Sequence, residues 1–361
     1  MSVLRPATLT RLNLARNISR SLEQDLSVIA VIATGSVARN RCSSTSDLDL
    51  TVITSDRGMR RSVTSESMKK VAIDIEWLTK RRAVSIMKGG SRDLKGLREA
   101  SRLGLGIFLL DRESVQSSFR VLAFNLLPEK HVIDQRMAAL MAILKKCSSQ
   151  RPSSPEVQWE WCRALVDNLA FVLLMLHPFR YHKPKWVMAD LRDAGHHSLS
   201  SLLRKAYRIG SDSSNTSCRS IELSRQFIEG MGQLMQTPSI EHMLKEGFTR
   251  KYAAWSYLCR TWEDAESLFQ DQAFGEANFT AKFAVRMTFP LYLEKFGSPD
   301  HATHPLVILK DIGNVRLSTL YHQLFPIPKK QPFPGQHMRQ KCLDLVRACM
   351  RMKQGVFGEQ P

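Results

Sequence analysis

Apolar and polar residues follow two different patterns in the two parts of the chain. Over about the first 125 residues, short apolar runs of strand length are separated by polar, turn-rich segments. From about Val132 onward, apolar residues recur three and four positions apart, as in amphipathic helices. The pattern predicts a mixed strand-and-helix domain at residues 1–125 and a helical bundle at residues 126–325. Residues 326–361 are predicted to form a proline-rich connector and a basic C-terminal helix.

The first part is expected to contain four strands. Residues 54–68 are polar and rich in turn-forming residues, so we expect a loop there. Asp111 is expected to cap the helix that follows it, because it directly precedes a helix-like segment. The predicted strands are Val28–Ile32, Asp47–Ile53, Val71–Thr79 and Gly106–Asp111, and a helix is predicted at Leu94–Leu103.

The first 22 residues allow two interpretations. They contain four arginines, several serines and threonines, and no acidic residue before Glu23, which is the composition of a mitochondrial transit peptide. The alternative, which we favour, is an ordinary first helix, because a strand follows too soon for a cleaved leader. The buried positions of that helix are predicted to be Leu9, Leu12, Ile18 and Leu22.

Candidate chemistry lies between the first and second predicted strands. The first strand leads into Gly35 and Ser36, whose backbone N–H groups would face an anion at the start of a helix. Asp47 and Asp49 occupy alternate positions of the second strand, so their side chains point the same way. Adjacent carboxylates repel each other unless a cation lies between them, and hard oxygen ligands of this kind suit Mg²⁺.

This stretch resembles the polymerase-beta-like nucleotidyltransferase superfamily. The family often has glycine where this chain has Asn40, and asparagine also tolerates a left-handed backbone. The resemblance covers residues 8 to 120, and it implies an α+β nucleotidyltransferase domain with a small mixed sheet, followed by an α-helical domain. The matching residues are Gly35, Ser36, Ala38 and Arg39, and then Ser46-Asp47-Leu48-Asp49-Leu50.

The resemblance also implies a third carboxylate. It usually lies on a later strand, at the position of Asp74, and Glu76 on the same face of that strand is the alternate. Asp47, Asp49 and Asp74 would then be the catalytic and metal-binding residues, holding two Mg²⁺ ions.

Binding of the triphosphate is implied for two further groups of residues. Gly35, Ser36 and Arg39 match the positions that hold a nucleoside triphosphate, with ATP as the first candidate. Lys183 and Lys185 stand beside a tryptophan that opens a helix, as basic residues do in several nucleotidyltransferases. The alternative for these lysines is a loop in which both are solvated.

Length and composition limit the class of protein and its location. With 361 residues, 43% hydrophobic and 24% charged, the chain is globular and long enough for two domains. The richest apolar segment, Ala164–Leu176, contains Asp167 and is too short to cross a bilayer, so no membrane partner is expected. The seven cysteines are scattered and never spaced Cys-x-x-Cys, which suits a cytoplasmic location and argues against zinc.

Positive charge is concentrated beside the candidate site. The net charge is +18, and between Arg57 and Arg98 twelve lysines or arginines stand against four acidic residues. Such a segment attracts a polyanion, either the nucleoside triphosphate or a nucleic acid. The alternative is a solvated basic face without a partner.

The resemblance implies transfer of a nucleoside monophosphate to an acceptor hydroxyl, with release of pyrophosphate. We favour a small-molecule acceptor, as in the antibiotic-adenylylating relatives, which also join a catalytic domain to a helical bundle. RNA is the alternative acceptor, favoured by the basic charge and disfavoured by the lack of a recognisable RNA-binding module. A non-catalytic nucleotide-binding regulatory module is the third possibility, and the intact set of carboxylates argues against it.

Overall fold

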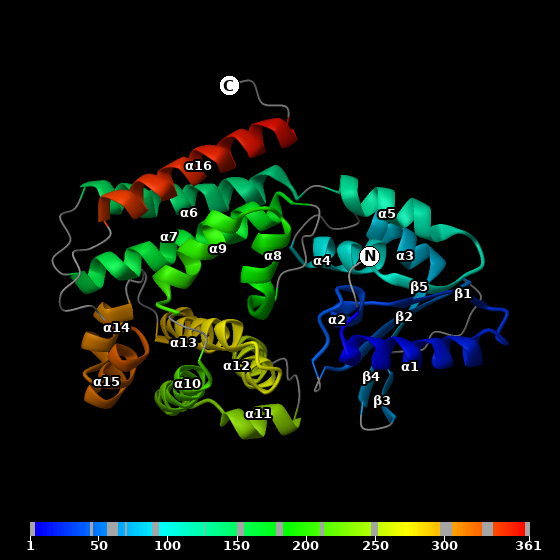
Figure 1. The fold of residues 1–361 in the computed structure, drawn as a ribbon, viewed down its shortest axis with the longest axis horizontal. Helices are drawn as coiled ribbons and strands as arrows, with labels where there is room; N and C mark the ends of the chain where they lie inside the picture. Colours follow the sequence, from blue (N-terminus) through cyan, green and yellow to red (C-terminus); the bar gives the residue numbers. More distant parts are fainter. Residues whose placement is uncertain are drawn as a thin grey trace. The chain divides into compact units, whose positions relative to one another are not determined.

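The computed structural model describes residues 4–43, 46–55, 64–68, 71–88, 94–126, 128–149, 155–177, 183–209, 213–246, 252–296, 305–326 and 335–357. The chain forms two compact units, Met1–Ile133 with Met175–His182, and Asp134–Leu174 with Lys183–Pro361. Over its described residues the first unit combines a sheet with helices, and the second is helical (Figure 1). The predicted fold class is therefore confirmed, whereas the exact boundaries at residues 126 and 326 remain predictions.

The first unit is built on a five-stranded sheet with the strand order β3-β4-β2-β1-β5 (Figure 1). β2 and β4 are parallel, while the other neighbouring strands are antiparallel, so the sheet is mixed. β5 lies at one edge of the sheet and β3 at the other. The strands are β1 (Val28–Ala33), β2 (Leu48–Thr54), β3 (Thr64–Met68), β4 (Val71–Thr79) and β5 (Ile107–Asp111).

Helices cover both faces of this sheet because its central strands are apolar on both sides. On one face Val31 of β1 and Leu50 of β2 pack against Leu12 of the first helix. On the other face Ile32 and Ile53 pack against three later helices. The helices of this unit are α1 (Pro6–Leu22), α2 (Gly35–Ala38), α3 (Lys80–Met87), α4 (Leu94–Gly104) and α5 (Val115–Asn125).

The loop predicted at residues 54–68 is a wrong prediction. The loop expected at residues 54–68 contains the edge strand β3, which pairs antiparallel with β4. Its sequence, Thr-Ser-Glu-Ser-Met, is largely polar, as edge strands often are. A hydrophobic pattern therefore cannot reveal it, because its pairing comes from backbone hydrogen bonds.

The predictions for the cap of α5 and for the buried face of α1 had different outcomes. The Asp111 carboxylate accepts the backbone N–H groups of Val115 at 2.8 Å and Gln116 at 3.0 Å, so it caps α5 as predicted. The first helix forms as expected, but Leu9 is 45% exposed. Leu14 is buried in the core instead, because the buried stripe of α1 follows the side that the sheet covers.

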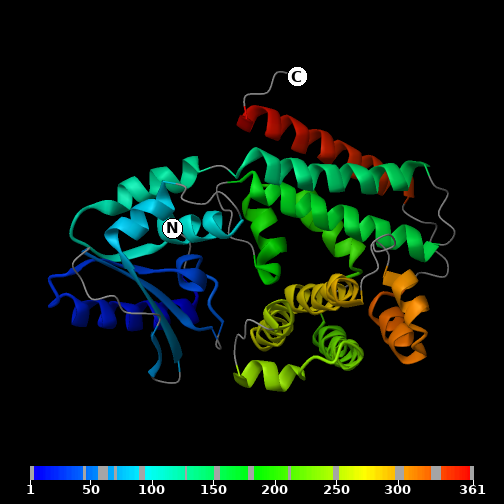
Figure 2. The same cartoon turned by 180° about the vertical axis from the view of Figure 1, so that it is seen from behind.

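The second unit is a set of packed helices. α10, α12 and α13 pack against one another, and α15 packs on α10 (Figure 2). The elements that belong to this unit or lead into it are α6 (Lys130–Ser149), α7 (Pro155–Met175), the 3₁₀ helix η1 (Pro184–Trp186), α8 (Val187–Asp193), α9 (His197–Ala206), α10 (Ser214–Leu234), α11 (Ile240–Glu246), α12 (Ala253–Gln270), α13 (Phe274–Phe296), α14 (Pro305–Ile312), α15 (Val315–Leu324) and α16 (Gly335–Phe357).

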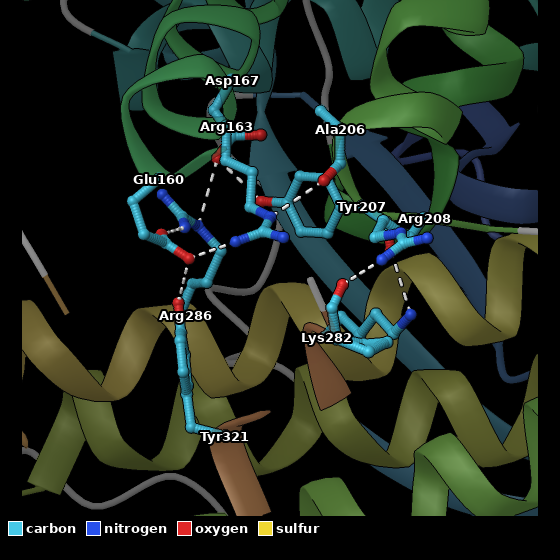
Figure 3. A network of polar contacts seen from close by, with 10 residues as sticks. Glu160, Arg163, Asp167, Ala206, Tyr207, Arg208, Lys282, Arg286 and Tyr321 are labelled. Atoms are coloured by element: carbon cyan, nitrogen blue, oxygen red, sulfur yellow. Dashed lines mark hydrogen bonds and ion pairs between the residues drawn. The ribbon is translucent and has the colours of Figure 1, made fainter. Parts of the chain in front are cut away.

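A buried network of charged side chains lies in the second unit (Figure 3). Glu160 of α7, 1% exposed, forms ion pairs with Arg163 and with Arg286 of α13, and it accepts a hydrogen bond from the Tyr321 hydroxyl. Burial by itself would raise the pKa of Glu160, but the two arginines and the tyrosine hydroxyl lower it to about 2. The Glu160 carboxylate therefore stays charged in the core, because two arginines and a tyrosine hydroxyl of the same unit stabilise its negative charge.

Two cations of this network donate to carbonyl groups at the end of α9 (Figure 3). Arg163 Nε donates to the carbonyl of Ala206 at 2.8 Å, and Lys282 Nζ donates to that of Tyr207 at 3.0 Å. Arg208 donates to the Pro326 carbonyl. Cations at a helix C-terminus satisfy its last carbonyl groups and interact favourably with its dipole. Burial and the charges of Arg163 and Arg208 lower the pKa of Lys282 to about 7.

Candidate functional site

Two neighbouring parallel strands bring the predicted carboxylates together. Asp49 of β2 is paired with Asp74 of β4 in the register of the sheet, and Asp47 lies just before β2. One ligand oxygen from each of the three side chains lies within 4.8 Å of the others, and all three residues are half-buried. The three predicted acidic residues therefore form one cluster.

Alternation along the strands explains why these carboxylates are accessible. Leu48 and Leu50 flank Asp49 and are 0% and 1% exposed, and Ile73 and Ile75 flank Asp74 in the same way. Since successive side chains of a strand point to opposite faces, burying the flanking residues turns both aspartates to the other face. The apolar residues thus fix the direction of the acidic ones.

Gly35 lies directly against the cluster. Its φ angle is +61°, and a Cβ atom there would lie 2.1 Å from Asp49 Oδ2. Only glycine combines this backbone conformation with so close an approach at no steric cost. The backbone N–H of Thr34 donates to the Asp49 carbonyl at 2.9 Å and holds this approach in place. The glycine is therefore required by the geometry of the site.

The short helix α2 begins at this glycine. N–H groups in the first turn of a helix have no partner within the helix, so those of Gly35 and Ser36 are suited to an anion. The Ser36 hydroxyl lies 3.4 Å from the Cys42 thiol. Arg39 is the C-cap of α2 and is half-buried. Asn40 has a φ of 54°, so it adopts the left-handed conformation expected of it.

Glu76 has a different environment from Asp74. It is paired with Thr51 in the sheet, two positions further along β4, and its carboxylate forms an ion pair with Arg102 of α4. Asp74, and not Glu76, belongs to the cluster of three acids in the part of the chain that the structure describes. The geometry favours Asp74 as the third carboxylate.

The two lysines predicted to reach the triphosphate lie in the second unit. Lys185 forms an ion pair with Asp264, and its ammonium group lies 5.6 Å from the centre of the Trp186 ring. Lys183 is the N-cap of η1. The ion pair of Lys185 agrees with a structural role, and binding of the triphosphate by these lysines stays a prediction.

The basic segment lies only partly within the described residues. Arg57, Arg60 and Arg61 lie outside the described residues, as do the other members at positions 69, 70 and 92. Within the described part, Lys80 pairs with Glu113, and Arg82 lies 3.9 Å from Glu99. Some of this positive charge is therefore balanced within the fold.

Sequence reasoning missed a set of contacts from α1 to the site. The guanidinium of Arg11, which is only 4% exposed, donates through Nε to the Ser46 carbonyl at 2.7 Å. Thr8 accepts the backbone N–H of Cys42 at 3.3 Å. In the sequence, Arg11 is one of four arginines in the first 22 residues, and no local pattern marks it as buried.

The donor set fits a hard divalent cation. Three carboxylates within 4.8 Å of one another supply the oxygen ligands and the negative charge that Mg²⁺ requires, and they leave further positions for substrate oxygens. Two unit charges about 4 Å apart repel by roughly 4 kcal/mol near a protein surface. A cation between them would relieve that repulsion, so the residues present are compatible with metal binding.

A family model for the nucleotidyltransferase domain matches residues 15–88 of the chain. This match includes Gly35 and all three clustered aspartates. The chain therefore carries a nucleotidyltransferase domain in its first unit, as the resemblance in the sequence indicates.

The remaining comparisons add little to this assignment. Among solved structures, the chain is similar to a nucleotidyltransferase-like protein from Exiguobacterium sibiricum 255-15, with 12% sequence identity over 87% of this chain and 88% of that chain. The TM-score is 0.24, so this likeness carries no weight for the fold. No curated protein matches the chain. None of the described helices is both long and apolar enough to cross a membrane.

Proposed function

We propose that this protein is a Mg²⁺-dependent nucleotidyltransferase that transfers a nucleoside monophosphate from a nucleoside triphosphate, ATP in the first place, to an acceptor hydroxyl. The observation that carries the proposal is the cluster of Asp47, Asp49 and Asp74 on neighbouring strands, with Gly35 against it. The nucleotidyltransferase domain matched at residues 15–88 supports the same reaction class.

Different residues of the chain would have different roles in the reaction. Asp47, Asp49 and Asp74 would hold two Mg²⁺ ions, which supply charge for the phosphoryl oxygens and lower the pKa of the acceptor hydroxyl. The N–H groups of Gly35 and Ser36 would bind the β- and γ-phosphates. The acceptor oxygen forms a bond to the α-phosphorus, the bond from that phosphorus to the bridging oxygen breaks, and pyrophosphate leaves.

The proton of the acceptor hydroxyl needs a base within reach. Asp74 is the best-placed candidate, because it lies in the cluster, while Glu76 is engaged by Arg102. Arg39, Lys183 and Lys185 complete the proposed triphosphate-binding set. The support for Arg39 is its position in the motif that begins at Gly35. The support for the two lysines is the resemblance.

The reaction can be tested by labelling. The purified chain is incubated with each α-³²P-labelled nucleoside triphosphate and Mg²⁺, together with either a metabolite extract or total RNA. We expect label to enter the small-molecule fraction and to require both Mg²⁺ and Asp49. The matched control is Asp344→Asn, an exposed aspartate of α16 that is distant in sequence from the site. Absence of label in both fractions would remove the proposed activity.

The acceptor is the finer part of the proposal, and a small molecule is favoured because a helical unit accompanies the catalytic domain, as in the antibiotic-adenylylating relatives. RNA is the alternative, since the net charge is +18. If RNA were the acceptor, its binding would weaken with rising salt, with a log–log slope of about 0.7 per phosphate contact. Arg81 and Arg82 are exposed on α3. Tight RNA binding that loses part of this slope in the Arg81→Ala/Arg82→Ala variant would reassign the acceptor to RNA.

A further inference from the structure

The three carboxylates of the cluster are positioned in two different ways. Asp49 and Asp74 are partners in the register of β2 and β4, so the hydrogen bonds of the sheet fix their separation. Asp47 lies outside the ladder, since β2 begins at Leu48. Its position therefore depends on the connection that leads from α2 into β2.

The helix α1 bonds to two residues between α2 and β2, Cys42 and Ser46. The Thr8 hydroxyl, on a residue that is 0% exposed, accepts the Cys42 N–H at 3.3 Å. One turn further along α1, Arg11 Nε donates to the Ser46 carbonyl at 2.7 Å. This carbonyl belongs to the peptide bond that joins Ser46 to Asp47. The Arg11 guanidinium is therefore bonded to the peptide group that contains the backbone nitrogen of Asp47.

Ser43 and Ser46 are also hydrogen-bonded to each other. The backbone N–H of Ser43 donates to the Ser46 hydroxyl at 2.8 Å, and the two serine hydroxyls lie 2.8 Å apart. The backbone N–H of Ser46 donates to the Ser43 carbonyl at 3.3 Å. These bonds hold Ser46 to Ser43, and Arg11 links Ser46 to the buried side of α1.

We propose that Arg11 is a positioning residue that orients Asp47 for divalent-cation binding through the Ser46 carbonyl. This inference rests on the proposed function, because it assumes that the cluster binds a metal ion. Arg11 is buried and permanently charged, and its planar guanidinium also donates to the Ala7 carbonyl at 3.3 Å, which fixes its direction. A purely structural role would stabilise α1 without affecting metal affinity.

The test measures affinity for Mn²⁺, used as the probe ion, by electron paramagnetic resonance of the free ion in the full-length protein. We expect Arg11→Met to weaken Mn²⁺ binding about 10-fold, the lower end of the effect of removing a residue that orients a metal ligand. Arg11→Lys should give an intermediate affinity, because lysine keeps the charge without the planar geometry. The matched control is Arg16→Met on the exposed side of the same helix, where Arg16 bonds to Asn13, and it should leave the affinity unchanged.

A double-variant cycle separates positioning from general stability. If Arg11 acts through Asp47, Arg11→Met should weaken Mn²⁺ binding no further in an Asp47→Asn background. Wild-type affinity in a folded Arg11→Met, or losses that multiply in the double variant, would overturn the inference and leave the proposed function standing. Should Arg11→Met fail to fold, wild-type affinity in Arg11→Lys would overturn it. A wild-type protein that binds no Mn²⁺ would remove the proposed function together with the inference.

Discussion

The acidic cluster of the first unit gathers like charges, whereas the buried network of the second unit pairs opposite charges. Asp47, Asp49 and Asp74 are like charges gathered within 4.8 Å at half-buried positions. Glu160, by contrast, is almost fully buried, and it is held by Arg163 and Arg286. Gathering like charges costs folding free energy, and it is therefore expected where an external cation binds.

The contrast extends to the scaffold around each cluster. In the sheet, strand register decides which acids meet, and the backbone of Gly35 lies directly against Asp49. In the helical unit, side chains from α7, α13 and α15 meet around one carboxylate. The first arrangement brings like charges together, whereas the second surrounds one carboxylate with cations and a hydroxyl from its own unit. Polarity alone therefore does not identify a site.

The largest effect is expected in the buried network. Glu160→Gln removes the negative charge that Arg163 and Arg286 share, and it leaves Arg163 buried beside a neutral partner and Arg286 with only its ion pair to Asp167. Breaking a buried ion pair in this way costs about 3–5 kcal/mol. Urea unfolding at pH 7 should show this loss in the free energy of unfolding. Asp344→Asn, whose partner Arg347 is exposed, is the control and should change stability by less than about 0.5 kcal/mol. An equally small loss in Glu160→Gln would remove the contrast.

In the acidic cluster the expected effect is on activity. Asp49→Asn should lower turnover by about 10²-fold or more, because it removes charge from the proposed metal site. It should leave the protein as stable as the wild type, or more stable, since it relieves repulsion between like charges. Labelled transfer and thermal unfolding measure the two quantities on one sample. If the variant kept more than about a tenth of wild-type turnover, the site would be wrongly assigned.

Asp74 and Glu76 allow the same comparison within one strand, between an acid of the cluster and an acid in an ion pair. Asp74→Ala should abolish transfer, whereas Glu76→Ala should mainly reduce stability, because Arg102 loses its ion-pair partner. Turnover at saturating Mg²⁺, measured beside the urea midpoint, distinguishes the two effects. An active Asp74→Ala next to an inactive Glu76→Ala would reverse the assignment.

The smallest effect concerns pH. Burial lowers the pKa of Lys282 from its usual value near 10.5 to about 7 in the folded protein. Between these values the unfolded chain binds a proton that the folded chain does not, so Lys282 makes stability rise as pH increases from 7 toward 10.5. The slope from one group is at most about 1.4 kcal/mol per pH unit. Urea unfolding at pH 7, 8 and 9 should show a shallower slope in Lys282→Met. Identical slopes in both proteins would mean that Lys282 keeps its ordinary pKa.

The sequence determined the location of the candidate site because its signal is local. Gly35 with Ser36, and Asp47 with Asp49, stand in order between apolar strand segments, and this order predicts both the turn and the face that the acids share. The third acid, Asp74 with Glu76 as the alternate, was implied by the resemblance. The turn and the shared face of the first two acids needed only the backbone preferences of glycine and the period of a strand.

The tertiary structure decided what depends on partners distant in the sequence. Parallel pairing of β2 with β4 set Asp74 opposite Asp49, and Arg102 from α4 engaged Glu76. The polar strand β3 was invisible to the hydrophobic pattern, because its pairing is carried by the backbone. The burial of Arg11 against the Ser46 carbonyl was equally hidden, since nothing in a single helix shows which of its arginines the rest of the fold will cover.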